Sequence, residues 1–160
     1  MHIHRIESFT LAVSLRSLQQ RLITALSEIN RKPLTFEQVA NPTVPQSTVI
    51  FELGIAEDEN FNYLDAEEAK KVLVEIRKKP FQVLDFFCVI RYYRKKEEKE
   101  TPMKFDYYLI RFTFSETVVE MRICSERGPR YVSPEDLSIF IVNEINKKFT
   151  KKVLKPTIID

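Results

Sequence analysis

The chain has 160 residues, of which 44% are hydrophobic and 30% are charged, and its formal net charge is +2. This length and composition are typical of one folded domain with a substantial core and a charged surface. Only two residues are glycines, which excludes glycine-rich phosphate loops, flexible linkers and collagen-like sequences. The twelve Phe and six Tyr residues, with no Trp, indicate a core built largely from aromatic rings.

The cysteines and the apolar runs indicate the compartment. Cys88 and Cys124 each lie inside an apolar run, and we expect buried, reduced thiols in preference to a disulfide. Polar residues interrupt residues 1–7 before any apolar region forms, which argues against a signal peptide. No apolar run approaches the roughly 20 residues that span a bilayer. We therefore expect a cytoplasmic protein, and its abundant Lys and Glu with sparse Gly point towards a thermophile.

The first segment predicts a strand followed by a helix. Residues 3–12 alternate along the chain, with a clearly apolar face only in their second half. Apolar residues then recur at spacings of three and four between Leu15 and Ile29, which is the pattern of a helix with one buried stripe. Ser14 is a suitable N-cap, and Pro33 stops the helix soon after its last apolar residue.

A loop, a second strand and a second helix are predicted next. Residues 32–47 contain three prolines and are expected to form an ordered loop, with room for a short strand at residues 34–39. The alternation at residues 48–55 indicates a strand with one strongly apolar face. The acidic stretch 57–62 is expected to be a loop that leads into a helix capped by Asp65.

The second half of the chain predicts a three-strand meander and a final helix. Residues 81–94 and 104–114 are apolar on both faces, which is typical of central strands covered on both sides. Residues 117–124 follow after a tight turn, and both connections are too short for a crossover helix, so we expect antiparallel pairing. Ser133 and Pro134 open the last helix as N-cap and first helical residue.

Together these elements predict an α+β fold with a mainly antiparallel sheet of about five strands and three helices, in the order β-α-β-α-β-β-β-α. The whole chain is expected to be a single domain. Within it, residues 1–80 are interpreted as framework, residues 81–149 as the meander with the final helix, and residues 150–160 as a basic tail.

No metal or cofactor motif is evident. His2 and His4 would face one side of a strand and could share a metal, but no further histidine is present to complete the site. Asp58, Asn60 and Asn62 resemble the start of a calcium-binding EF-hand loop, yet the glycine and glutamate that such a loop requires are missing. We therefore predict neither a metal site nor a small-molecule cofactor.

Catalysis also lacks a motif, and no catalytic residue is predicted. The sequence contains no nucleophile elbow. Asp85 lies inside an apolar strand, where a carboxylate reaches the sheet edge, pairs with a base such as Arg111 or Arg122, or has a raised pKa. A structural salt bridge is favoured over a catalytic acid. An enzyme with a site near Asp85, Arg127 and Arg130 remains the third functional hypothesis.

Basic and aromatic residues gather around the first hairpin of the meander. Basic side chains interleaved with rings on adjacent strands can hold phosphates while the rings stack on bases. The alternative is a twisted hairpin with solvated charges, because three glutamates dilute the field at its tip. The candidate residues for binding nucleic acid or anions here are Arg91, Tyr93, Arg94, Lys95, Lys96 and Lys104.

Two further basic segments are candidates. Arg127 and Arg130 lie just before the final helix, whose free N–H groups could bind an anion, although acidic residues in its first turn would compete. The tail carries basic pairs that could bind nucleic acid, an acidic partner or anionic lipid, or could simply be solvated at a helix end. The tail candidates are Lys147, Lys148, Lys151 and Lys152.

The sequence thus favours a non-enzymatic binding or scaffold subunit that acts through protein–protein contacts. A protein partner or a second copy of the chain is the expected ligand, because catalytic motifs are missing while an aromatic-rich sheet and a charged hairpin are present. The alternative is an RNA- or DNA-binding protein that uses the basic hairpin and the Lys-rich tail.

Overall fold

The computed structural model describes residues 3–40, 47–57, 59–96 and 99–157. In chain order these residues form β1 (Ile3–Leu11), α1 (Leu15–Ile29), β2 (Pro33–Thr35), α2 (Phe36–Val39), β3 (Ser47–Glu57), β4 (Asn60–Tyr63), α3 (Ala66–Lys78), β5 (Val83–Lys96), β6 (Lys99–Phe114), β7 (Val118–Arg127), α4 (Pro134–Asn146) and β8 (Leu154–Pro156).

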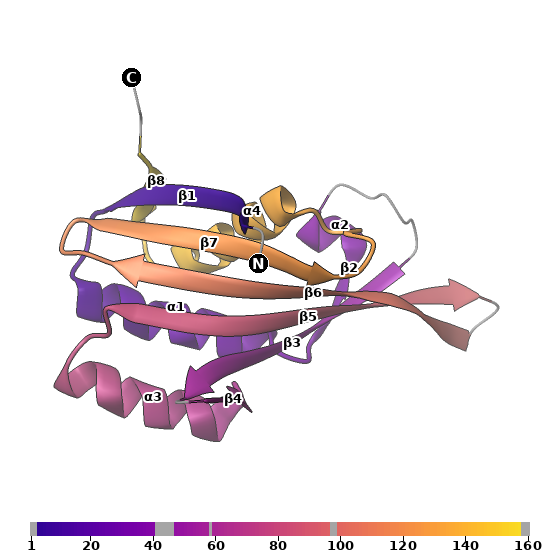
Figure 1. Ribbon diagram of the computed structural model, residues 1–160, viewed down its shortest axis with the longest axis horizontal. Coiled ribbons are helices and arrows are strands. Elements are labelled where there is room, and N and C mark those ends of the chain that lie inside the picture. Colours follow the sequence, from indigo (N-terminus) through magenta and orange to yellow (C-terminus); the bar gives the residue numbers. More distant parts are fainter. Residues whose placement is uncertain (1–2, 41–46, 58, 97–98, 158–160) are drawn as a thin grey trace.

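All of the strands belong to one antiparallel sheet. Its order is β2-β3-β5-β6-β7-β1-β8, and β4 pairs with β3 outside this path (Figure 1). The first strand, β1, therefore lies between β7 and β8, which come from the last third of the chain. The predicted α+β class and antiparallel sheet are confirmed. The predicted numbers are wrong, because the described residues form eight strands and four helices.

The additional elements are short and rely on tertiary contacts. The short strand expected at residues 34–39 is β2 at Pro33–Thr35, and residues 36–39 form α2 instead. There the Gln38 side chain accepts the backbone N–H of Thr35, and Phe36 is fully buried. The predicted acidic loop contains β4, which pairs with β3. In the predicted tail, β8 pairs with β1 and buries Leu154.

The predicted helix starts are confirmed. Each N-cap side chain accepts a hydrogen bond from the backbone N–H three residues further on, which satisfies one of the unpaired donors of the first helical turn. The three pairs are Ser14 with Ser17, Asp65 with Glu68, and Ser133 with Asp136.

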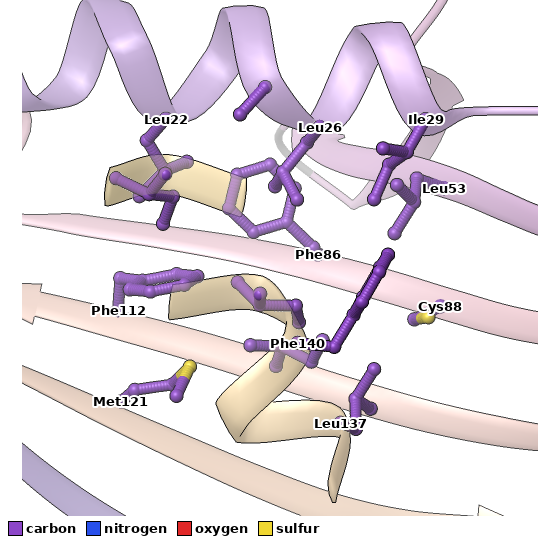
Figure 2. Packing of buried hydrophobic residues seen from close by; sticks show 14 of the residues in the cluster. Leu22, Leu26, Ile29, Leu53, Phe86, Cys88, Phe112, Met121, Leu137 and Phe140 are labelled. Atoms are coloured by element: carbon purple, nitrogen blue, oxygen red, sulfur yellow. The ribbon is translucent and has the colours of Figure 1, made fainter. Parts of the chain in front are cut away.

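The hydrophobic core lies between the sheet and the helices α1 and α4, which Figure 1 shows behind the strands. Figure 2 shows Leu22 and Leu26 of α1 and Phe140 of α4 among the buried side chains of the strands, which include Phe86 and Phe112. The ring of Phe140 also stacks on Phe51 at a centroid distance of 5.3 Å. The helix α3 packs beside α1 and adds one buried stripe.

Two other sequence predictions concern the cysteines and membrane-spanning segments. Cys88 and Cys124 are both buried and free of a disulfide, as expected. Among the described residues, no helix is both long enough and apolar enough to span a bilayer.

Candidate functional site on the open face of the sheet

The face of the sheet turned away from α1 and α4 is called the open face here. Directly opposed residues of antiparallel strands share a face, so the pairing register identifies its members. The helices of the described chain pack on the other face. The side chains that define the central part of the open face are Ile6, Glu52, Gly54, Ala56, Phe61, Tyr63, Val83, Asp85, Phe87, Val89, Arg91, Phe105, Tyr107, Leu109, Arg111, Arg122 and Cys124.

Four rings form an aromatic cluster on this face, with Phe87 at its centre. Phe61 and Tyr63 of β4 meet Phe87 edge-on, at centroid distances of 5.3 and 6.0 Å. Tyr107 of β6 stacks on Phe87 at 6.2 Å, with an interplanar angle of 5°. Edge-to-face and offset-stacked pairs are the favoured aromatic geometries, so the cluster is a preorganised apolar surface.

The exposed hydrophobic side chains of the molecule gather on the same face. Six large hydrophobic side chains in the described residues are exposed, and four belong to the open face: Ile6 at 53%, Phe61 at 42%, Tyr63 at 55% and Val83 at 42%. The other two lie on α3 and α4. Most of the exposed large hydrophobic side chains of the described residues therefore belong to this face.

Asp85 and Arg111 form a two-pronged ion pair across β5 and β6. Nε of Arg111 donates to Oδ1 of Asp85 at 2.7 Å, and Nη2 donates to Oδ2 at 3.0 Å. The carboxylate raises the pKa of the Arg111 guanidinium, mainly through this hydrogen bond. The predicted pairing of Asp85 with Arg111 is thus present, and the carboxylate acts as a hydrogen-bond acceptor for its neighbour.

Two further ion pairs lie nearby. Nε of Arg91 donates to Oε1 of Glu52 at 2.6 Å, and the hydrogen bond raises the pKa of Arg91. Arg122 pairs with Glu120 on its own strand. Each of the three arginines in the central part of this face is therefore matched by a carboxylate, and this part combines apolar rings with locally neutralised charges.

A shallow pocket of about 430 Å³ lies between the cluster and the ion pairs. Its lining includes Phe61, Asp85, Leu109, Arg122 and Cys124. Burial raises the pKa of the Cys124 thiol, so the thiol stays protonated and is not an activated nucleophile. In the described part of the chain, no group of three or more His, Cys, Asp or Glu residues could hold a metal ion. The pocket therefore offers groups for binding, and its carboxylate, Asp85, is already hydrogen-bonded to Arg111.

Of the predicted hairpin residues, Arg91 and Tyr93 lie on the open face. The guanidinium of Arg91 lies 5.6 Å from the ring centroid of Phe105. Arg94 is exposed and alternates to the other face of β5. Lys104 is exposed and shares a hollow of about 440 Å³ with Phe105.

Some of the predicted residues lie beyond what the structure describes. Lys95 and Lys96 belong to β5 by their backbone, but their side chains lie outside the described residues. The same holds for the side chain of His4, and His2 and Asp58 lie outside altogether.

The loop that carries Arg127 and Arg130 is built around a residue that the sequence analysis did not single out. Asp106 of β6 is fully buried. Its carboxylate accepts the hydroxyl of Tyr92 at 2.5 Å and the backbone N–H groups of Arg130 and Tyr131 at 2.5 and 2.9 Å. Burial and this carboxylate together raise the pKa of Tyr92 far above its usual range. We call this arrangement the Asp106 cluster.

A glycine allows the loop to close over Asp106. Gly128 has a φ of 114°, and a Cβ atom there would overlap the carboxylate of Asp106 and the carbonyl of Phe105. The cluster continues to the start of α4, because the backbone N–H of Val132 donates to the Tyr92 hydroxyl at 3.0 Å. A polar residue at an inward position of an otherwise apolar strand is the one sequence signal that could have indicated this site.

The two loop arginines are separated by this geometry. Arg127 is opposite Tyr107 in the sheet register and shares the hollow with Lys104 and Phe105. Arg130 donates from Nε to the Ser125 hydroxyl at 3.2 Å. The first turn of α4 is already capped by the Ser133 side chain, which accepts the backbone N–H of Asp136.

The basic tail lies on the helical side of the molecule. Lys147 pairs with Glu144 at 2.9 Å, and Lys148 pairs with Glu28 of α1. Lys151 and Lys152 are exposed beside α4. The structure therefore brings Arg91, Tyr93 and Arg127 to one end of the open face, where Lys104 lines the hollow beside Arg127, and it leaves the four tail lysines on the helical side.

The open face thus combines an aromatic cluster with three ion pairs. Comparisons of the chain with models of protein families, with curated proteins and with solved structures gave no match.

Proposed function

We propose that this protein is a non-enzymatic binding subunit whose open face contacts a protein partner. The observation that carries the proposal is the aromatic cluster around Phe87, in which Phe61 and Tyr63 are exposed. Soluble monomers rarely leave large contiguous apolar patches uncovered, and such patches mark interaction surfaces. An antiparallel sheet with one solvated face usually carries polar residues there, and this one carries rings.

The composition of the face also favours a protein ligand. Aromatic residues and arginine are enriched at the centres of protein interfaces and among the residues that contribute most binding energy. Here the rings of Phe61, Tyr63 and Phe87 adjoin the Asp85–Arg111 pair. A partner would bury the rings while the paired charges set its orientation.

Catalysis receives less support from the same site. The carboxylate of Asp85 is engaged by Arg111, and the thiol of Cys124 is held protonated by burial. Neither group has the activated state that a nucleophile or a general acid requires.

Site-specific crosslinking tests the proposal. We would replace Tyr63, which is 55% exposed on the open face, by the photoreactive residue benzoylphenylalanine and irradiate cells that produce the protein. The matched control carries the same residue at Val74, which is 44% exposed on α3. Discrete crosslinked protein bands from position 63, missing from position 74, are expected. Equal and diffuse labelling at both positions would reject the proposal.

A second candidate is nucleic-acid binding at the hairpin end of the open face. The supporting observation is that Arg91 lies over the Phe105 ring while Lys104 and Arg127 share the adjoining hollow. Basic side chains beside rings suit a single strand that stacks its bases. The engagement of Arg91 by Glu52 weakens this candidate.

The nucleic-acid candidate predicts salt-sensitive binding of a labelled single-stranded RNA, measured by fluorescence anisotropy. Replacing both Lys104 and Arg127 by Glu should abolish that binding. A control with the same charge change at the exposed residues Lys70 and Lys79 of the α3 segment should retain it. No anisotropy change at low salt would remove the candidate.

A further inference from the structure

We infer that the partner of the open face is a second copy of this chain, with two open faces packed against each other across a two-fold axis. The inference rests on the proposed function, because it names the protein that the open face binds. A face-to-face pair of sheets is a common architecture, with the sheets about 10 Å apart and their strands within about 30° of each other.

The size of the open face matches the requirement of a stable dimer. It extends across six strands, from β4 through β3, β5, β6 and β7 to β1, which is about 24 Å at a strand spacing of about 4.8 Å. Along β5 it runs from Val83 to Arg91, which is roughly 27 Å at about 3.4 Å per residue. The resulting area is on the order of 650 Å² before side-chain relief is counted, close to the roughly 800 Å² per partner of a standard interface.

The charges of the open face suit a copy of itself. Its three arginines pair with Glu52, Asp85 and Glu120 within the same chain. The central part of the face therefore has no excess of either sign, and the surplus charge of Arg127 lies at one end, so two copies can approach at the centre without net repulsion. A strongly acidic or basic partner would gain little from such a surface. A two-fold interface requires a self-complementary patch, which a mixture of rings and both signs of charge provides.

The strand sequences agree with this partner. Both β5 and β6 carry apolar side chains on their two faces, a pattern that predicts strands covered on both sides. Within the described chain only one of these faces is covered by helices. A second open face would cover the other, and it would bury Phe87 and Leu109, which lie opposite each other in adjacent strands at the middle of the face.

The test is the mass of the full chain in solution. Sedimentation velocity from about 1 to about 200 µM should show a species of twice the 18.9 kDa chain mass, with its share rising with concentration. Leu109→Glu places a charge at the middle of the face and should weaken dimerisation by about 100-fold or more. Val74→Glu makes the same kind of change on α3 and should leave the dimer unchanged.

A second variant guards against loss of folding. Arg111 is exposed, so Arg111→Glu should keep the fold, as circular dichroism would show, while it puts two acids side by side on the face. It should also shift the equilibrium towards monomer. A dimer that persists in both folded variants uses another surface and would overturn the inference.

The remaining outcomes separate the inference from the function that it rests on. A wild-type chain that is monomeric at every concentration overturns the homodimer. If position 63 then crosslinks to other proteins, the proposed function stands with a different partner. If position 63 crosslinks to nothing, both proposals fail. A single-stranded RNA that binds the monomer through the open face would assign the surface to nucleic acid instead.

Discussion

The ring of Phe87 lies so close over Gly54 that a Cβ atom on residue 54 would overlap the ring carbons. The two residues are directly opposed on β3 and β5. Glycine normally weakens a strand, and it is tolerated where another group approaches the backbone closely. The missing side chain at residue 54 is therefore what allows the aromatic cluster to assemble around Phe87.

This relationship predicts the effect of Gly54→Ala. The added methyl group must displace the Phe87 ring, and we expect the free energy of unfolding to fall by about 1–3 kcal/mol. Urea denaturation measures the change. In a Phe87→Ala background the same substitution should cost less, because the clash is gone, and the two changes should therefore be strongly non-additive. If the free-energy changes of the two substitutions simply add, the Phe87 ring is not the reason why residue 54 is glycine.

The Asp106 cluster predicts a large difference between two aspartates. Asp106→Asn replaces one of the two accepting oxygens, which together accept three hydrogen bonds, by an NH2 group that faces a donor. We expect a loss of about 2–4 kcal/mol in unfolding free energy. Asp85→Asn is the matched control, because Asp85 forms a partly exposed ion pair whose loss should cost about 1 kcal/mol or less. Equal effects of the two substitutions would contradict the role of the cluster.

Stability is expected to fall at alkaline pH. Burial raises the pKa values of Cys88, Tyr92 and Tyr108 in the folded protein above those of the unfolded chain. The folded state therefore keeps protons that the unfolded state releases. Stability is retained below the unfolded pKa values, about 8.5 for Cys and about 10 for Tyr, and it is lost as pH rises above them. Each group contributes a slope of up to about 1.4 kcal/mol per pH unit.

Urea titrations at a series of pH values, together with tyrosinate absorbance, measure this slope. Tyr92→Phe should give a shallower decline above pH ~10, because one titrating group is removed. Tyrosinate absorbance from Tyr92 and Tyr108 should appear only as the protein unfolds. A stability that stays constant up to pH ~12 would contradict the expectation.

The two thiols should react slowly with Ellman's reagent in the native protein at pH ~8. Cys88 is fully buried and Cys124 is 7% exposed, so Cys124 should react before Cys88. If two open faces pack together, Leu109→Glu should also speed the reaction of Cys124, its neighbour in the sheet register, and leave Cys88 unchanged. Rapid labelling of both thiols in the native protein would contradict the burial of the core.

The longer elements and their starts were predictable because local physics determines them. Ser14, Asp65 and Ser133 cap helices through bonds that span only three residues. The short strands β2, β4 and β8 contain three or four residues, too few for a periodic pattern. Each depends on a neighbouring strand that the local sequence does not specify, so β4 and β8 were missed and the bounds of β2 were wrong.

Contacts in the candidate site were predictable from the sequence only where both interacting groups are side chains. The pairing of Asp85 with Arg111 followed from a charge in an apolar strand with bases on the strands beside it. Asp106 binds backbone N–H groups of a loop 24 and 25 residues further on, and backbone groups leave no trace in a sequence. The open face was also unexpected, since apolar residues on both faces of β5 and β6 predict two covering layers, and the helices of the described chain supply only one.

The position of β1 between β7 and β8 has a consequence for how the chain folds. β1 cannot pair with β7 until residues 118–127 have been made, nor with β8 until residues 154–156 have been made. Contacts between such distant segments form late and slow the folding reaction. Residues 3–11 therefore remain without a strand partner while the intervening chain is made, and unpaired strand edges are prone to aggregation during that time.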